Sequence, residues 1–133
     1  SPASLARRGD AREIALALLE QGCFNETLAA CEAAVDAASE TGEAARVLAD
    51  IAADERRHAA LAWRTLAWLI REHPQVRASL RSRLARLAAQ VPASGERAAI
   101  HAATLRELIV PLAHELLRRD DAEAPRRSDA PEA

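Results

Sequence analysis

Two long stretches of helical periodicity, separated by a short break, constrain the fold of this chain most. In residues 11–38 and 43–72 apolar side chains recur every three to four positions, and most of them are Ala and Leu, which favour helix. The break at residues 39–42 contains Ser, Thr and Gly, which can end one helix and cap the next. Each helix would be about 40 to 45 Å long, and so short a connection makes the two helices antiparallel neighbours. The sequence therefore predicts a long helical hairpin.

Two further helices are predicted after the hairpin. Pro74 ends the second helix and suits the first turn of a third, over residues 75–90. The turn-forming residues 91–95 precede a fourth helix over about residues 95–119, in which we expect Pro111 to cause a kink. The expected fold class is all-α, a helical bundle built on the long hairpin.

The length and the last residues of the chain indicate one domain with a tail. A chain of 133 residues is long enough for a single hydrophobic core and short for two. We expect this helical domain to occupy residues 1–119. Residues 120–133 contain two prolines, several charges and no large apolar side chain, so we expect them to be disordered.

Charge, hydropathy and cysteine usage exclude several kinds of partner. The formal net charge is −2, with acids and bases interspersed, so no field of one sign would attract nucleic acid or an anionic membrane. No apolar run approaches the roughly 20 residues of a membrane span. Cys23 and Cys31 would lie about 12 Å apart on one helix, too far for a disulfide. We therefore expect a cytoplasmic protein with reduced cysteines that binds neither nucleic acid nor membrane.

Three ionisable residues interrupt the apolar faces of the predicted hairpin. At 100° per residue, Glu26 lies on the apolar face of the first helix, and Glu55 and His58 lie on that of the second. Residues three apart are helix neighbours, so Glu55 and His58 can offer an oxygen and a nitrogen to one ion. Glu26 precedes the break by about as many residues as Glu55 follows it, so the hairpin brings them to one level. Since buried carboxylates need a partner, the pattern predicts a carboxylate and histidine metal site.

A metal-free arrangement is the alternative. Glu26 could hydrogen-bond to His58 while Arg64 or Arg12 neutralises Glu55. The chain would then serve as a helical interaction or scaffold module, because alanine-rich helix faces pack closely against partner helices. A metal site requires the three side chains to converge, whereas a scaffold lets the acids reach solvent or arginines.

The sequence around these residues resembles part of a known superfamily. The segments GCFNET at residues 22–27 and DERRHAALAW at residues 54–63 resemble the second helix pair of ferritin-like di-iron carboxylate proteins. The resemblance covers roughly residues 10–72. In that superfamily two such helix pairs each supply a lone Glu and a Glu-x-x-His, which together hold two metal ions.

The resemblance implies roles for four residues. Glu26 would be a terminal ligand, Glu55 the bridging carboxylate and His58 the imidazole ligand. Asp54, next to Glu55, would interact with the ligands without binding the metal itself. Carboxylates with imidazole suit iron or manganese, in a dinuclear centre if the site is complete. An active protein of this kind would be an oxidoreductase that oxidises ferrous iron or reacts with oxygen or peroxide.

One set of ligands is present where the superfamily uses two, and neither His101 nor His114 belongs to a second Glu-x-x-His. Two completions remain open. The other half could have preceded Ser1, which is consistent with the absence of methionine from the chain. Alternatively, two copies could pair about a twofold axis and double the set, as in encapsulated ferritins. The ligand count favours the homodimer.

Overall fold

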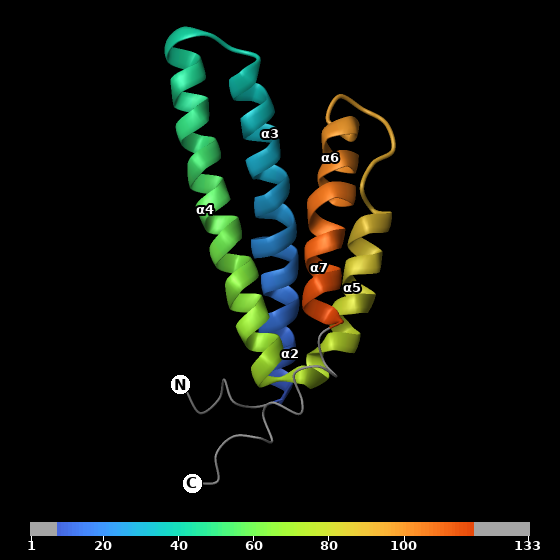
Figure 1. Cartoon of the computed structure of the whole chain (residues 1–133). Helices are drawn as coiled ribbons and strands as arrows, with labels where there is room; N and C mark the ends of the chain where they lie inside the picture. Colours follow the sequence, from blue (N-terminus) through green and yellow to red (C-terminus); the bar gives the residue numbers. More distant parts are fainter. Residues whose placement is uncertain (1–7, 119–133) are drawn as a thin grey trace, which may run out of the picture.

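The computed structural model describes residues 8–118, and the regular secondary structure in this part of the chain is entirely helical (Figure 1). The predicted all-α fold is confirmed. No helix in residues 8–118 is long and apolar enough to cross a membrane. The tail predicted for residues 120–133 lies outside the described residues.

The first helical segment is continuous but not uniform. It consists of α2, the π-helical segment η1 and α3, with the bounds Arg8–Ala17, Leu18–Asn25 and Glu26–Ala38. After a short turn it is followed by α4, Gly42–Glu72, which runs antiparallel to α3 (Figure 1). Gly42 has a φ of 66°, a conformation that glycine adopts without strain. The predicted hairpin is therefore present, with ends within about three residues of those expected.

The second helix pair is shorter and contains a second π-helical segment. A 3₁₀ turn, η2 (Pro74–Val76), leads into α5 (Arg77–Ala89). The remaining elements are α6, η3 and α7, with the bounds Ala98–Thr104, Leu105–Ile109 and Val110–Leu117. This last segment begins about three residues later than predicted. The irregularity expected at Pro111 takes the form of the π-helical η3 just before it, because proline has no N–H to continue regular helical bonding.

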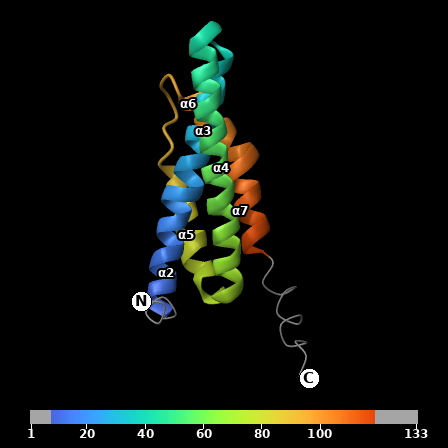
Figure 2. The same ribbon diagram turned by 90° about the vertical axis from the view of Figure 1, so that its left-hand side faces the viewer.

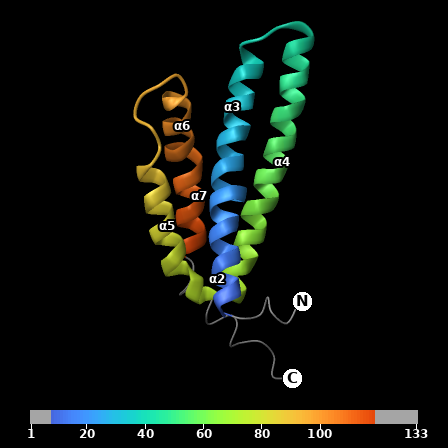
Figure 3. The ribbon, with the colours of Figure 1, turned by 180° about the vertical axis from the view of Figure 1, so that it is seen from behind.

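The second pair covers one part of the hairpin. α5 packs against α2, α6 against α3 and α7 against α4. Figures 2 and 3 show α5 and α7 beside α2 and the last half of α4, while the tip of the α3–α4 hairpin extends beyond them. The large buried side chains therefore gather at one end of the molecule: Leu16, Leu19, Phe24, Trp63, Leu66, Leu69, Ile70, Val76, Leu80, Leu84, Leu87, Ile109 and Leu117.

Towards the hairpin tip, small residues and ion pairs replace this core. The buried apolar residues of α3 and of the first half of α4 are alanines: Ala30, Ala33 and Ala52. Arg97, just before α6, donates to both carboxylate oxygens of Asp36 on α3, at 3.0 and 3.1 Å. His101 of α6 lies 3.3 Å from Glu32 of α3. The middle of the hairpin is thus the boundary between a well-packed core and a partly solvated helix pair.

Candidate metal site

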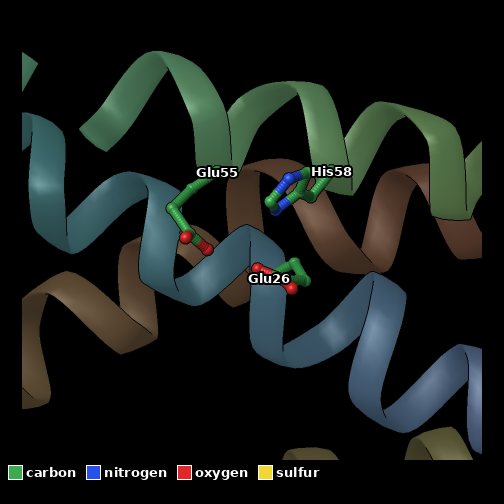
Figure 4. Close-up of side chains that lie close together, drawn as sticks. All are labelled: Glu26, Glu55 and His58. Atoms are coloured by element: carbon green, nitrogen blue, oxygen red, sulfur yellow. The ribbon is translucent and has the colours of Figure 1, made fainter. Parts of the chain in front are cut away.

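Glu26, Glu55 and His58 converge at this boundary. Glu26 is the first residue of α3, and Glu55 and His58 lie in the middle of α4. One potential ligand atom from each residue lies within 4.8 Å of those of the other two (Figure 4). The hairpin register expected from the sequence therefore brings the three side chains together, as a metal site requires.

The exposure of the three residues differs from the expectation of a fully buried site. Glu26 and Glu55 are half-buried, but His58 is exposed, so its predicted burial is wrong. Ile51, two turns before His58 on the same face of the helix, also keeps 45% of its surface exposed. The reason is tertiary: α5, α6 and α7 do not cover this side of α4, so the site opens towards solvent.

A π-helical segment leads directly into the site. η1 ends at Asn25, so Glu26 is the first residue after it. A π turn holds more residues than an α turn and rotates the residues that follow relative to those before. The helix can therefore bury Cys23 and Phe24 in the core and still turn Glu26 towards α4. π-helical turns occur frequently at functional sites, and nothing in the sequence indicated this one.

The first and second helical segments approach closely beside the site. A Cβ atom added to Gly22 would lie 2.8 Å from Cβ of Ala62, nearer than real Cβ atoms approach. Gly22 lies about one turn before Glu26, and Ala62 about one turn after His58. Two small residues thus set the spacing at which the ligands of opposite helices can meet.

A buried hydrogen bond near the site fixes the register of the two helices. Trp63 Nε1 donates to Thr27 Oγ1 at 3.0 Å, and both side chains are buried. Thr27 directly follows Glu26, and Trp63 belongs to the turn after His58. A slip of one helix along the other would leave this buried indole N–H without an acceptor, so the bond helps to keep the three side chains level.

The electrostatics of the site reflect two carboxyl groups in contact. A hydrogen bond with Glu26 raises the pKa of Glu55, and desolvation and the charge of Glu26 raise it further. His58 acts in the opposite direction. The hydrogen bond raises this pKa because an ionised carboxylate can only accept, so the bond favours the protonated form of Glu55. A divalent cation between the two groups would act in the opposite direction and favour the ionised form of Glu55.

The residues expected to support or replace the ligand set lie elsewhere. Asp54 is exposed and pairs with Arg57, and it influences the site through its charge, which contributes to the raised pKa of Glu55. Arg12 donates from Nε to Ser79 Oγ on α5, so it does not neutralise Glu55. The hydrogen bond that affects Glu55 comes from Glu26. Arg12 therefore does not have the role that the metal-free alternative gives it.

The two cysteines take no part in the site. Both are free, as expected, and Cys23 is fully buried in the core. Burial raises the pKa of the Cys23 thiol to about 12, so it stays protonated at neutral pH. Cys31 is half-buried on α3, facing α6. A thiolate ligand from either residue is not needed to explain the cluster.

The donor set fits a divalent metal after a small adjustment. Ligand atoms bonded to one ion at about 2.0 to 2.2 Å can be at most about 4.4 Å apart. The three atoms lie within 4.8 Å, so side-chain movements of well under about 1 Å would bring them to bonding distance. Two carboxylates and an imidazole are donors that iron and manganese accept.

Comparison of the chain with protein-family models, with curated proteins and with solved structures found no match. The interpretation of this cluster therefore depends on its own geometry and chemistry. Two acids in contact repel each other when both are ionised, and a bound cation would offset that repulsion.

Proposed function

We propose that this chain is a ferritin-like metal-binding protein in which Glu26, Glu55 and His58 bind iron or manganese. The observation that carries the proposal is the convergence of three ligand atoms from two helices within 4.8 Å. The sequence resemblance to one helix pair of the ferritin-like di-iron superfamily agrees with the same three residues. Oxygen and imidazole donors without a thiolate select iron or manganese over metals that prefer sulfur.

The complete site would be dinuclear and shared by two copies of the chain. Three ligands leave a metal ion with open positions, whereas two copies related by a twofold axis supply four carboxylates and two histidines. Two observations support this arrangement: His58 is open to solvent, and Ile51 and Val47 expose apolar surface on the same side of α4. A partner helix that covered these apolar side chains would bring its own ligands to the site.

In such a site each residue has a definite task. Glu55 would serve as the carboxylate common to both ions, and Glu26 and His58 would be terminal ligands; each ligand has to be deprotonated to bind metal. The proposed reaction is the oxidation of ferrous iron: two ferrous ions give up one electron each, and dioxygen takes both electrons and two protons to form hydrogen peroxide.

Metal content measured together with mass tests this proposal. The protein is loaded anaerobically with ferrous iron, freed of excess metal, and examined by elemental analysis and light scattering. We expect about one iron per chain in a dimer. His58→Ala and Glu55→Gln should lose most of the iron, whereas His114→Ala, which removes an exposed histidine on α7, should keep it. Equal iron content in all three variants, or none in the wild type, would contradict the proposal.

A metal-free interaction module is the second candidate. Val47, Ile51, Leu61 and Trp68 of α4 all expose large apolar surface, with 58% of Leu61 accessible. Such a row of side chains suits the groove of a helical partner. This alternative predicts that His58→Ala leaves partner binding intact, and that a Leu61→Asp change abolishes it without any dependence on metal.

A further inference from the structure

A polar pocket lies between α2 and α5, apart from the three converging residues. It encloses about 250 Å³, and five of the side chains that line it end in a guanidinium or a hydroxyl group. The lining residues are Arg12, Leu16, Ala78, Ser79, Ser82, Arg83 and Arg86. Hydrogen-bond donors therefore dominate the wall of this pocket.

Positive charge is concentrated at this pocket although the whole chain is weakly acidic. α5 contains four arginines and no acidic residue in 13 positions. Two acids partly balance the pocket: Glu13 lies 3.7 Å from Arg12, and Glu20 lies 3.1 Å from Arg83. Among the described residues, Arg86 has no ion pair. Three guanidinium groups thus face two carboxylates, which leaves an excess of positive charge.

The pocket is partly pre-organised and has an unused donor. Arg12 is held by the hydrogen bond from its Nε to Ser79 Oγ, at 2.9 Å. Arg83 is held through Nη1, which donates to Glu20 Oε1. The Nε of Arg83 is shielded from solvent and has no hydrogen-bond partner among the described residues. A buried N–H without an acceptor costs free energy, and an oxyanion in this pocket could satisfy it after a small movement of the Arg83 side chain.

We propose that this pocket binds a phosphate group, as inorganic phosphate or as the terminal phosphate of a small phosphomonoester. Arginine offers planar, paired N–H donors that match phosphate oxygens, and serine hydroxyls add donors at other angles. The volume is below the roughly 300 Å³ at which sites for drug-sized ligands begin, so the recognised part is a small group.

Calorimetric titration of the metal-free protein with inorganic phosphate tests the proposal. Removing metal beforehand keeps phosphate from binding to an ion at Glu26, Glu55 and His58, so the result is independent of the proposed metal function. At constant ionic strength we expect one saturable site per chain, and no saturation with chloride. Glycerol 3-phosphate is the second probe: its binding would assign the pocket to phosphomonoesters, and its failure to bind would assign it to the free ion. Heats that match the chloride titration would overturn the proposal.

Three variants distinguish specific binding of phosphate in this pocket from general electrostatic attraction of anions to the chain. Arg86→Gln removes an exposed guanidinium, so it should leave the fold intact and weaken phosphate binding about tenfold or more. Arg83→Lys keeps the charge but removes Nε, and it should also weaken binding because a lysine lacks the planar fork. Arg64→Gln removes an exposed arginine of α4 that does not line the pocket, and it should bind as the wild type does. Equal weakening in all three variants would show unspecific attraction and contradict the proposal.

Discussion

At the scale of single residues, Glu55 links the structure to its chemistry. Its carboxyl group is hydrogen-bonded to Glu26, and this bond is the main cause of its raised pKa. A protein gains nothing in stability by holding two acids together when both are ionised. Their proximity is the feature on which the proposed metal site depends.

The pKa shift of Glu55 predicts how the stability of the metal-free protein varies with pH. The ordinary pKa is 4.5, and between that value and the raised one the folded chain holds a proton that the unfolded chain has released. The free energy of unfolding should therefore fall as the pH rises through this window. Urea unfolding of the metal-free protein at a series of pH values measures this, and added Mn²⁺ should reverse the loss.

Two variants check the cause of that trend. Glu55→Gln cannot ionise, so the fall in stability over this pH range should be smaller than in the wild type. Glu72→Gln removes an exposed acid at the end of α4 and should leave the trend of the wild type unchanged. An identical pH profile for wild type and Glu55→Gln would show that the two carboxyl groups are not coupled.

At the scale of elements, the contact between η1 and α4 determines whether the ligands can meet. Gly22 and Ala62 touch where larger side chains would separate the helices. The Thr27–Trp63 hydrogen bond acts at the same level and fixes the position along the helix axis. The spacing and the register of the site are therefore set by neighbours of the ligands, not by the ligands themselves.

Gly22→Ala tests this contact. A methyl group at this position overlaps Ala62, which should cost about 1 to 3 kcal/mol. Alanine favours a helix over glycine by roughly 1 kcal/mol, so the net loss of stability should be up to about 2 kcal/mol. We expect the variant to be less stable in chemical denaturation and to bind metal more weakly.

The matched control for Gly22→Ala exchanges the two residues. In the double variant Gly22→Ala with Ala62→Gly, the methyl group moves to the other helix and the overlap disappears. Its stability should exceed the value expected from adding the effects of the two single changes, with a coupling of about 1 kcal/mol or more. Additive effects would mean that the two helices do not depend on this contact.

At the scale of the whole molecule, the site lies where the four-helix core gives way to the projecting hairpin (Figure 1). One side of α4 is left uncovered there, and it exposes Ile51 beside the ligands. Burial of apolar surface is the main driving force for the association of protein chains. The proposed dimer would cover this surface and complete the ligand set at the same time.

The substitution Ile51→Glu should dissociate the proposed dimer into monomers. A charge placed on this surface would oppose the burial of apolar side chains at an interface, while an exposed position in a helix tolerates glutamate. Analytical ultracentrifugation should show a monomer with a normal helical spectrum and little bound iron. Leu112→Glu, at a similarly exposed position on α7, should remain a dimer with metal. A dimeric, iron-loaded Ile51→Glu variant would rule out this face as the interface.

Local rules explain why much of the hairpin could be predicted from the sequence. Helix length and a four-residue break determine the register of an antiparallel pair, because the rise per residue is constant. Glu26 and Glu55 therefore had to lie near the same level, and they do. The proline at position 74 and the glycine at position 42 mark their turns for equally local reasons.

Long-range packing decided the rest. The exposure of His58 depends on which part of α4 the later helices cover, and helical periodicity cannot specify that. No residue pattern marks the π-helical turn before Glu26. It arises from packing between helices that are distant in the sequence, which leaves no local signal. The phosphate-sized pocket joins Arg12 to residues of α5 more than sixty positions later in the chain. The sequence by itself determined the helices and the level of the three ligands, since both follow from local geometry, whereas only the tertiary structure decided what is buried, what is open and which distant side chains meet.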